Sequence, residues 1–444
     1  MAPAKHMPAR PAQSLLRRLA PLALLLALGL GGAAAVARAD DPAAAEPAHR
    51  LVLESVELEG ATRTPLSTVL LYLPLVPGQD IDQGSLVAAV DSLKGSGLFP
   101  EVGFYTRPGS ARGRLVLVLE VREHGMDVRW AAGNTDLDGW YLVPAMLALD
   151  NVSGHGERFD LQWRIGFRHS GALLNYLRPR AGDGRSYWGL RLSAVSTDWP
   201  WFADGVEYRH EVETDGLGGV WGRRVTDRWL WELGAQVQRV ATDDASRAYT
   251  DNADGTIRID DRIGPDQLPP GIRDGLGEDF RAMAHLDLQW DTRSAERRAG
   301  TPIAGAWGRL KTTGTAQGDR SHVGLQGDFR GYREVPGGVL ALRLRGALVT
   351  SNAAFYDRLY LGGMYTVRGF PSHSLSAPGG DTWLWSGSLE HRSRILGDAK
   401  GTRLAGVFFL DAGAAGGFGS DAFPGVSAGV GYGVRMRVWW LDWI

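Results

Sequence analysis

From about residue 125 to the end of this 444-residue chain, apolar and polar residues alternate in one segment after another. The clearest run lies at residues 159–167, FDLQWRIGF, where every second residue is a large apolar one. The same pattern recurs in four further segments, at residues 188–193, 229–238, 280–291 and 340–348. A period of two residues is typical of β-strands that have one apolar and one polar face. The chain therefore has to form a large sheet with two unlike faces.

The composition of the two faces limits how such a sheet can be buried. One face is rich in Trp, Phe and Leu, the other in Arg, Asp and Gln, and the region holds neither a long helix nor a second set of apolar segments to cover the sheet. A closed transmembrane antiparallel β-barrel, with lipid outside and a wet lumen inside, satisfies both faces. The 60 glycines and 16 tryptophans fit turns and membrane interfaces. We therefore predict a mainly β fold with roughly 16 strands over residues 125–444; a secreted soluble β-domain is the alternative.

The N-terminus predicts export. Basic residues precede an apolar run from Leu19 to Leu30, and Ala37-Arg38-Ala39 provides small residues for cleavage before Asp40. Residues 1–39 are therefore predicted to be a signal peptide, with a transmembrane anchor as the alternative. The chain has no cysteine, which excludes disulfides, thiolate metal sites and a cysteine nucleophile. A net charge of -2 and the lack of a basic run do not indicate a nucleic-acid partner.

Residues 49–124 predict a separate small α+β domain. An apolar strand over residues 51–58 is followed by a short helix near residues 64–72 and by a second helix over residues 83–94. Asp82 can cap the second helix and Gly95 can end it. Two further strands are predicted at residues 102–106 and 115–121, the last one strongly apolar.

The stretch at residues 357–376, DRLYLGGMYTVRGFPSHSLS, is an unusual loop between two predicted strands. Its middle carries apolar and aromatic residues around a single charge, Arg368, and Gly362, Gly363 and Gly369 give the backbone freedom. We predict that the loop folds into a cavity formed by the rest of the chain; a surface loop with chance aromatics is the alternative.

Residues 49–124 resemble a POTRA domain, a periplasmic module that binds polypeptides. The resemblance rests on SGLFPEVGFYTRPG followed by LVLVLEVRE, with Gly97, Leu98 and Phe99 at the end of the second helix. It implies that the domain binds clients by adding a strand to a sheet edge. A generic α+β spacer is the alternative.

The predicted barrel resembles the BamA/TamA superfamily of outer-membrane assembly and secretion barrels. Asp291, Arg293, Pro302 and Gly305 match a barrel motif of that family, although the spacer between them is slightly long. Val367, Arg368, Gly369 and Phe370 match the motif of its in-folded loop, here residues 357–376. Glu390 and Asp411 match acidic residues of the next two strands.

The resemblance implies that the loop arginine reaches into the lumen and pairs with acids of the barrel wall. The alternation agrees, because Glu390 and Asp411 both fall on the polar face of their strands. We therefore predict that Arg368 pairs with both acids; lumen acids that are hydrated and unpaired are the alternative.

Two segments carry weaker expectations. The polar segment 242–278 is predicted to be a solvated loop outside the cell, because the carboxylates of DNADG lack the remainder of a calcium-loop pattern. The last residues, WWLDWI, read as a short or incomplete closing strand.

No nucleophile, metal or phosphate motif stands out, so we predict a non-enzyme without catalytic residues, cofactor or metal site. The predicted function is an outer-membrane protein assembly or translocation factor whose POTRA-like domain receives unfolded client in the periplasm. Its predicted partners are unfolded or partly folded polypeptide, outer-membrane lipid and accessory envelope proteins, without nucleic acid. A passive outer-membrane pore, or the barrel anchor of a secretion system, is the alternative. A two-partner secretion transporter is a third possibility, although it usually has two POTRA domains and a plug helix.

Overall fold

The computed structural model describes residues 51–129, 132–135, 139–166, 168–251, 257–293, 302–398, 401–418 and 425–436. The predicted signal peptide and the predicted incomplete strand after residue 436 lie outside the described residues. Within these ranges, no helix is both long and apolar enough to cross a membrane.

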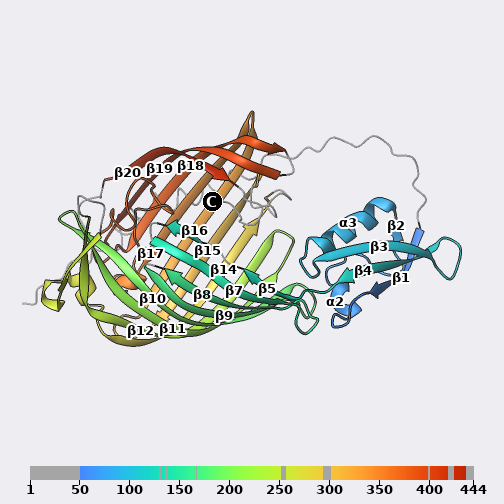
Figure 1. Ribbon diagram of the computed structural model, residues 1–444, viewed down its shortest axis with the longest axis horizontal. Helices are drawn as coiled ribbons and strands as arrows, with labels where there is room; N and C mark the ends of the chain where they lie inside the picture. Colours follow the sequence, from blue (N-terminus) through green and yellow to red (C-terminus); the bar gives the residue numbers. More distant parts are fainter. Residues whose placement is uncertain are drawn as a thin grey trace, which may run out of the picture.

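Residues 51–122 form a small four-stranded sheet with two helices on it (Figure 1). The sheet order is β2-β1-β4-β3, with β1 (Leu51–Glu59) parallel to β4 (Arg114–Arg122), and with β2 (Asp80–Ile81) and β3 (Glu101–Pro108) at the edges. The helices are α2 (Leu66–Leu70) and α3 (Gln83–Lys94). Their core residues are almost fully buried, as the apolar faces of β1, α3 and β4 predict: Leu53, Val90, Leu93, Leu117 and Leu119.

The predicted start of α3 is confirmed. The Asp82 side chain accepts a hydrogen bond from the Ser85 backbone N–H at 2.7 Å, and the Ser85 hydroxyl binds the Asp82 backbone N–H at 3.0 Å. This reciprocal pair satisfies two of the backbone donors that a helix N-terminus leaves without partners.

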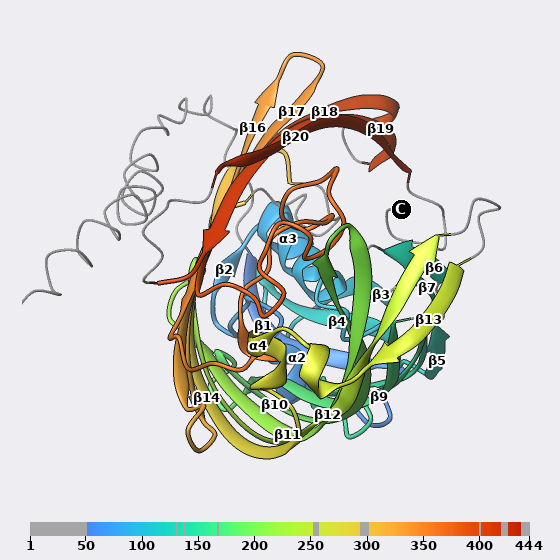
Figure 2. The same ribbon diagram turned by 90° about the vertical axis from the view of Figure 1, so that its left-hand side faces the viewer.

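The remaining strands form one large antiparallel sheet that curves into a ring-like wall (Figures 1 and 2). Neighbours in sequence are neighbours in the sheet, from β5 to β20, with β6 pairing to β7 and β13 pairing to β12. The strands are β5 (Met126–Arg129), β6 (Ala132–Thr135), β7 (Gly139–Asp150), β8 (Arg158–Gly166), β9 (His169–Ala181), β10 (Ser186–Ala203), β11 (Val206–Arg224), β12 (Trp229–Asp251), β13 (Ile257–Ile263), β14 (Glu278–Asp291), β15 (Gly305–Ala316), β16 (His322–Val335), β17 (Gly338–Val349), β18 (Trp383–Asp398), β19 (Gly401–Gly416) and β20 (Ser427–Met436). The described residues contain no ladder between β5 and β20, so closure and the number of roughly 16 strands stay predictions.

The two faces of the wall differ as the alternation predicts. On the outside, large apolar side chains stay exposed, among them Phe280, Leu389, Phe408 and Val430. Their neighbours on the inside are polar and buried, such as Glu390 and Asp411. An apolar outer face of this kind, unsupported by other protein, is the face that a bilayer covers.

The prediction of a solvated loop at residues 242–278 is wrong for its described part. β12 continues to Asp251 and pairs with β13, and two short helical turns follow, η2 (Pro265–Gln267) and α4 (Pro270–Arg273). Leu268 and Ile272 of this segment are buried against Trp201 and Phe355. Two apolar residues of this otherwise polar segment thus anchor it to residues of the wall and of the connection after β17.

The small sheet and the large sheet meet through a hydrogen-bonded junction. Asn151, at the β7–β8 turn, donates to the Thr64 hydroxyl at 2.6 Å, and both residues are buried. Arg180 of β9 donates to the Leu71 carbonyl at 2.6 Å and stacks over the Tyr72 ring at 4.6 Å. The two units are therefore held together by contacts from two different turns of the wall.

Glu123, immediately after β4, binds the segment between β1 and α2 that includes the junction residue Thr64. It accepts hydrogen bonds from the Thr64 hydroxyl and backbone N–H, both at 2.8 Å, and from Thr62 and Arg63. Burial of the carboxylate raises its pKa, but the hydrogen bonds from Thr64, Thr62 and Arg63 outweigh this effect and hold the pKa of Glu123 well below its usual range.

We expect the junction to weaken in acid. Because the folded-state pKa of Glu123 is depressed, its contribution is present above the unfolded-state pKa of about 4.3 and is lost as the pH falls toward the folded value. Limited pepsin digestion below about pH 4 should cut near residue 124 progressively faster as the pH decreases. Glu123→Gln should flatten this dependence, whereas Glu101→Gln, an exposed carboxylate beside Arg122, should keep it. An unchanged dependence in Glu123→Gln would contradict the assignment.

Candidate functional site: the loop arginine and the lumen wall

The loop at residues 357–376 lies inside the wall, beside β17, β18 and β19 (Figure 2). Leu361 and Val367 are fully buried and pack against Ala347, Leu384 and Ala415 of these strands. The apolar residues that are unusual for a loop therefore contact the inner face of the wall. This is the placement that the sequence predicts for the stretch.

Three glycines shape the tip of the loop. Gly362, Gly363 and Gly369 all have positive φ, at 108°, 91° and 95°. A Cβ on Gly362 would lie 2.5 Å from the Pro371 carbonyl oxygen, so a side chain cannot fit there. The Gly363 backbone N–H donates to the Phe370 carbonyl at 2.9 Å and closes the turn that presents Arg368.

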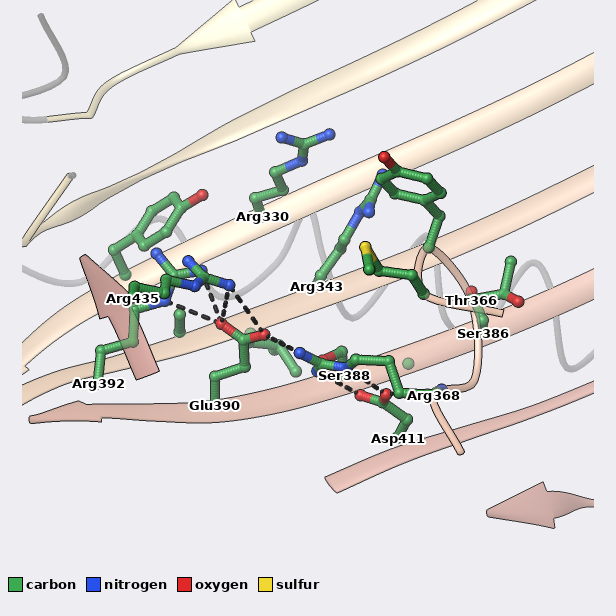
Figure 3. Close-up of a pocket in the computed structure, with 16 residues that line it drawn as sticks. Arg330, Arg343, Thr366, Arg368, Ser386, Ser388, Glu390, Arg392, Asp411 and Arg435 are labelled. Atoms are coloured by element: carbon green, nitrogen blue, oxygen red, sulfur yellow. Dashed lines mark hydrogen bonds and ion pairs between the residues drawn. The ribbon is translucent and has the colours of Figure 1, made fainter. Parts of the chain in front are cut away.

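Arg368 makes the central contact of the site (Figure 3). Its guanidinium donates to Asp411 through Nε at 2.7 Å and Nη2 at 2.8 Å, and its backbone N–H donates to the same carboxylate at 3.1 Å. Nη1 donates to Glu390 at 2.7 Å. A bidentate pair of this kind fixes both distance and orientation. The structure thus brings Arg368, Glu390 and Asp411 together.

The register of the wall explains why the two acids meet. Ser388 on β18 lies opposite Asp411 on β19, and Glu390 is two residues further along the same face of β18. Asp411 is 1% exposed and Glu390 7% exposed. Burying a carboxylate costs free energy unless the carboxylate is paired with a positive charge. The loop arginine therefore offsets the desolvation penalty of the two wall acids.

Three contacts of Arg368 or of its partners were not predicted from the sequence. The Phe409 ring lies 3.7 Å from the guanidinium carbon, and Arg392 and Arg435 both contact Glu390. Arg392 shares the parity of Glu390 on β18, and Arg435 has the parity opposite to the exposed Val434 of β20. The alternation of inward and outward side chains along each strand assigns Arg392 and Arg435 to the inner face. It does not predict which strands bring these residues to Glu390.

The other family-motif residues form a separate cluster at the turn between β14 and β15. Arg293 binds Asp291 through two hydrogen bonds of 3.0 Å. Gly305 has φ of 92°, and a Cβ there would collide with the Thr292 carbonyl. Pro302 precedes it and is buried. Asp291, Arg293 and Gly305 thus hold one turn of the wall, and they do not contact Arg368.

The contacts of the site are hydrogen bonds and ion pairs between the loop and the wall. Among the described residues, no three histidine, aspartate or glutamate side chains gather where they could hold a metal ion. The hydrogen bonds of Arg368 to Asp411 and Glu390 hold the loop against the wall.

A curved antiparallel wall, apolar outside and charged inside, with a loop anchored to its inner face, defines an outer-membrane β-barrel. The model of the Omp85 superfamily domain matches residues 151–438, and the chain belongs to that superfamily. Barrels of this superfamily are outer-membrane proteins that take part in protein insertion or secretion.

Solved structures share the fold at low sequence identity. A BamA from Haemophilus ducreyi lacking POTRA domains 1–3 has a TM-score of 0.62 and 16% identity, over 87% of this chain and 79% of that chain. CdiB from Acinetobacter baumannii has a TM-score of 0.52 and 13% identity, over 88% of this chain and 68% of that chain. CdiB from Escherichia coli has a TM-score of 0.50 and 12% identity, over 96% of this chain and 91% of that chain. No curated protein matches the sequence.

Proposed function

We propose that the protein is an outer-membrane assembly or translocation factor, in which residues 49–124 act as a POTRA domain and receive an unfolded client. Residues 125–444 then act as the barrel that inserts the client into the membrane or passes it outward. The observation that carries the proposal is the direct junction between a small sheet with an open edge and a wall whose interior holds an anchored loop.

The open edge is β3. Over its eight residues it pairs with β4 on one side, and its side chains are mostly exposed. An edge strand of this length presents unpaired backbone groups that an extended peptide can bind as an additional strand. The second edge strand, β2, has two residues and offers much less.

The small sheet contacts the wall at the ends of its strands that carry short turns, such as the turn after Asp150. The long connections between β13 and β14 (residues 264–277) and between β17 and β18 (residues 350–382) leave their strands at the other end (Figure 1). Because outer-membrane barrels have short periplasmic turns and long outer loops, this polarity supports a periplasmic position for residues 49–124. The partners are then unfolded polypeptide, outer-membrane lipid and accessory envelope proteins, and no catalytic step is assigned to the chain.

The anchored loop argues against the alternative of a passive pore or a simple anchor. A passive pore does not require a loop that is held by a half-buried arginine and two buried acids. The cost of burying these groups is understandable where the loop has to keep a fixed position during client transfer.

The test uses proteoliposomes that contain the full chain or a chain that lacks residues 49–124. A urea-denatured outer-membrane β-barrel protein is added, and its insertion or its delivery into the vesicle is followed by the heat-modifiable gel shift and by protection from protease. We expect the full chain to accelerate one of these outcomes and the shortened chain to lose this effect while its own barrel stays heat-modifiable. Equal acceleration by both chains, or none by the full chain, would refute the proposal.

A further inference from the structure

A cavity of about 290 Å³ lies on the inner face of the wall beneath the tip of the anchored loop (Figure 3). Strands β16 to β20 all contribute to its lining, together with the loop residues around Tyr365. Five of the lining residues are arginines: Arg330, Arg343, Arg368, Arg392 and Arg435. Two are acids, Glu390 and Asp411.

The arginines of the cavity share their carboxylates. Glu390 is contacted by Arg368 at 2.7 Å, Arg392 at 2.8 Å and Arg435 at 3.3 Å. One carboxylate therefore balances parts of three guanidinium groups, each of which has five N–H donors.

The other two arginines share a single acid as well. Arg330 and Arg343 both bind Asp328 of β16, at 3.0 Å and 2.7 Å. With Asp328 included, five arginines face three acids, which leaves an excess of two positive charges around the cavity. Such an excess of positive charge on one part of the lumen wall attracts an anionic group.

The size and position of the cavity limit the chemical class of ligand that can bind there. A volume of about 290 Å³ holds a side chain or two with water, and not the headgroup and acyl chains of a lipid. Leu340 and Leu389 are exposed and alternate with the polar residues of the same strands, so lipid meets the opposite side of the wall. Tyr332, Met364 and Tyr365 add apolar and aromatic surface beside the arginines. A charged side chain on a polypeptide matches this combination.

We propose that this cavity binds carboxylate groups of the client polypeptide and so holds acidic segments of the client against the lumen wall. This inference rests on the proposed function for the existence of a polypeptide client, and it adds the chemistry by which the wall recognises one. The bound carboxylate accepts hydrogen bonds from arginine donors that the shared acids do not use.

The test measures the binding of fluorescent peptides to the full chain in detergent micelles. The probes are a short aspartate-rich peptide and the same peptide with every aspartate replaced by asparagine. We expect the acidic peptide to bind about tenfold or more tightly than the amide peptide, and its affinity to fall as salt increases. Equal binding of the two peptides, or no binding of the acidic one, would overturn the proposal without the need for any variant.

A double variant, Arg343→Gln with Arg435→Gln, assigns the binding to this cavity. It leaves Arg330 on Asp328 and Arg368 and Arg392 on Glu390, so neither wall acid loses all its partners. The matched control is Arg191→Gln, on the polar face of β10 beside Asn175. Binding of the acidic peptide should weaken about tenfold in the double variant and stay unchanged in the control. Unchanged binding in a heat-modifiable double variant would contradict the assignment, and the charge-preserving Arg343→Lys with Arg435→Lys should restore most of it.

Inorganic phosphate distinguishes a peptide site from a general anion site. We expect phosphate to compete weakly with the acidic peptide. Phosphate binding that is tighter than that of the peptide would overturn the assignment to carboxylates of a polypeptide. If client insertion in proteoliposomes proceeds while the acidic peptide does not bind, this inference fails and the proposed function stands.

Discussion

Arg368→Ala is expected to destabilise the barrel by about 3–5 kcal/mol, because it leaves a buried carboxylate without its counter-charge. Asp411 is 1% exposed and takes two side-chain hydrogen bonds from Arg368. Urea unfolding of the refolded chain in lipid, followed by the heat-modifiable gel shift, measures the loss. Arg191→Ala is the control, because that guanidinium donates to the neutral Asn175 amide, and it should cost about 1 kcal/mol or less. Wild-type stability in Arg368→Ala would show that the pairing contributes nothing.

The same contact makes a prediction for double variants. Glu390→Gln combined with Arg368→Ala should add little to Arg368→Ala alone, because both changes remove one interaction. Asp411→Asn should couple to Arg368 more strongly than Glu390→Gln does, since Glu390 keeps Arg392 and Arg435 as partners. Independent, additive effects of the paired changes would refute the contact.

Gly429→Ala is expected to have the second large effect, by pushing the loop away from the wall. Gly429 lies opposite Asp411 in the β19–β20 register, and a Cβ there would overlap the Arg368 carbonyl oxygen. Because the obstacle is backbone, rotation of a side chain cannot relieve it, and the loop itself has to move. We expect a loss of about 1–3 kcal/mol or more in the same urea experiment.

Gly433→Ala is the matched control for this change. It lies four residues further along the same face of β20, and a Cβ there meets no atom within 4 Å. Its stability should equal that of the wild type. If the two alanine variants behave alike, the close contact of the loop with β20 is not real.

The local features of this fold could be predicted from the sequence, because they depend on residues close together in the chain. The alternation identifies strands and assigns Glu390 and Asp411 to the inner face, and the Asp82 cap marks the start of α3. The motif around Arg368 and the two acids was predicted as one group because each member carried a local signal and the resemblance named their pairing.

The rest depends on contacts between distant segments. Arg392 and Arg435 reach Glu390 only because β18, β19 and β20 pair in one particular register. Leu268 and Ile272 lie in a polar stretch, and their burial depends on Phe355, far along the chain. Local sequence patterns do not predict contacts between residues that are far apart in the chain. The cavity and the packing of the segment after β13 are therefore known only from the structure.

We expect the anchored loop to occupy the lumen of a barrel that handles polypeptide and does not conduct as a passive pore. Planar-bilayer recording of the full chain measures whether the lumen is blocked. We predict low and fluctuating conductance for the wild type, and a clear increase in Arg368→Ala, where the loop loses its anchor. A steady, high and ungated conductance of the wild-type chain would contradict the account and favour a passive pore.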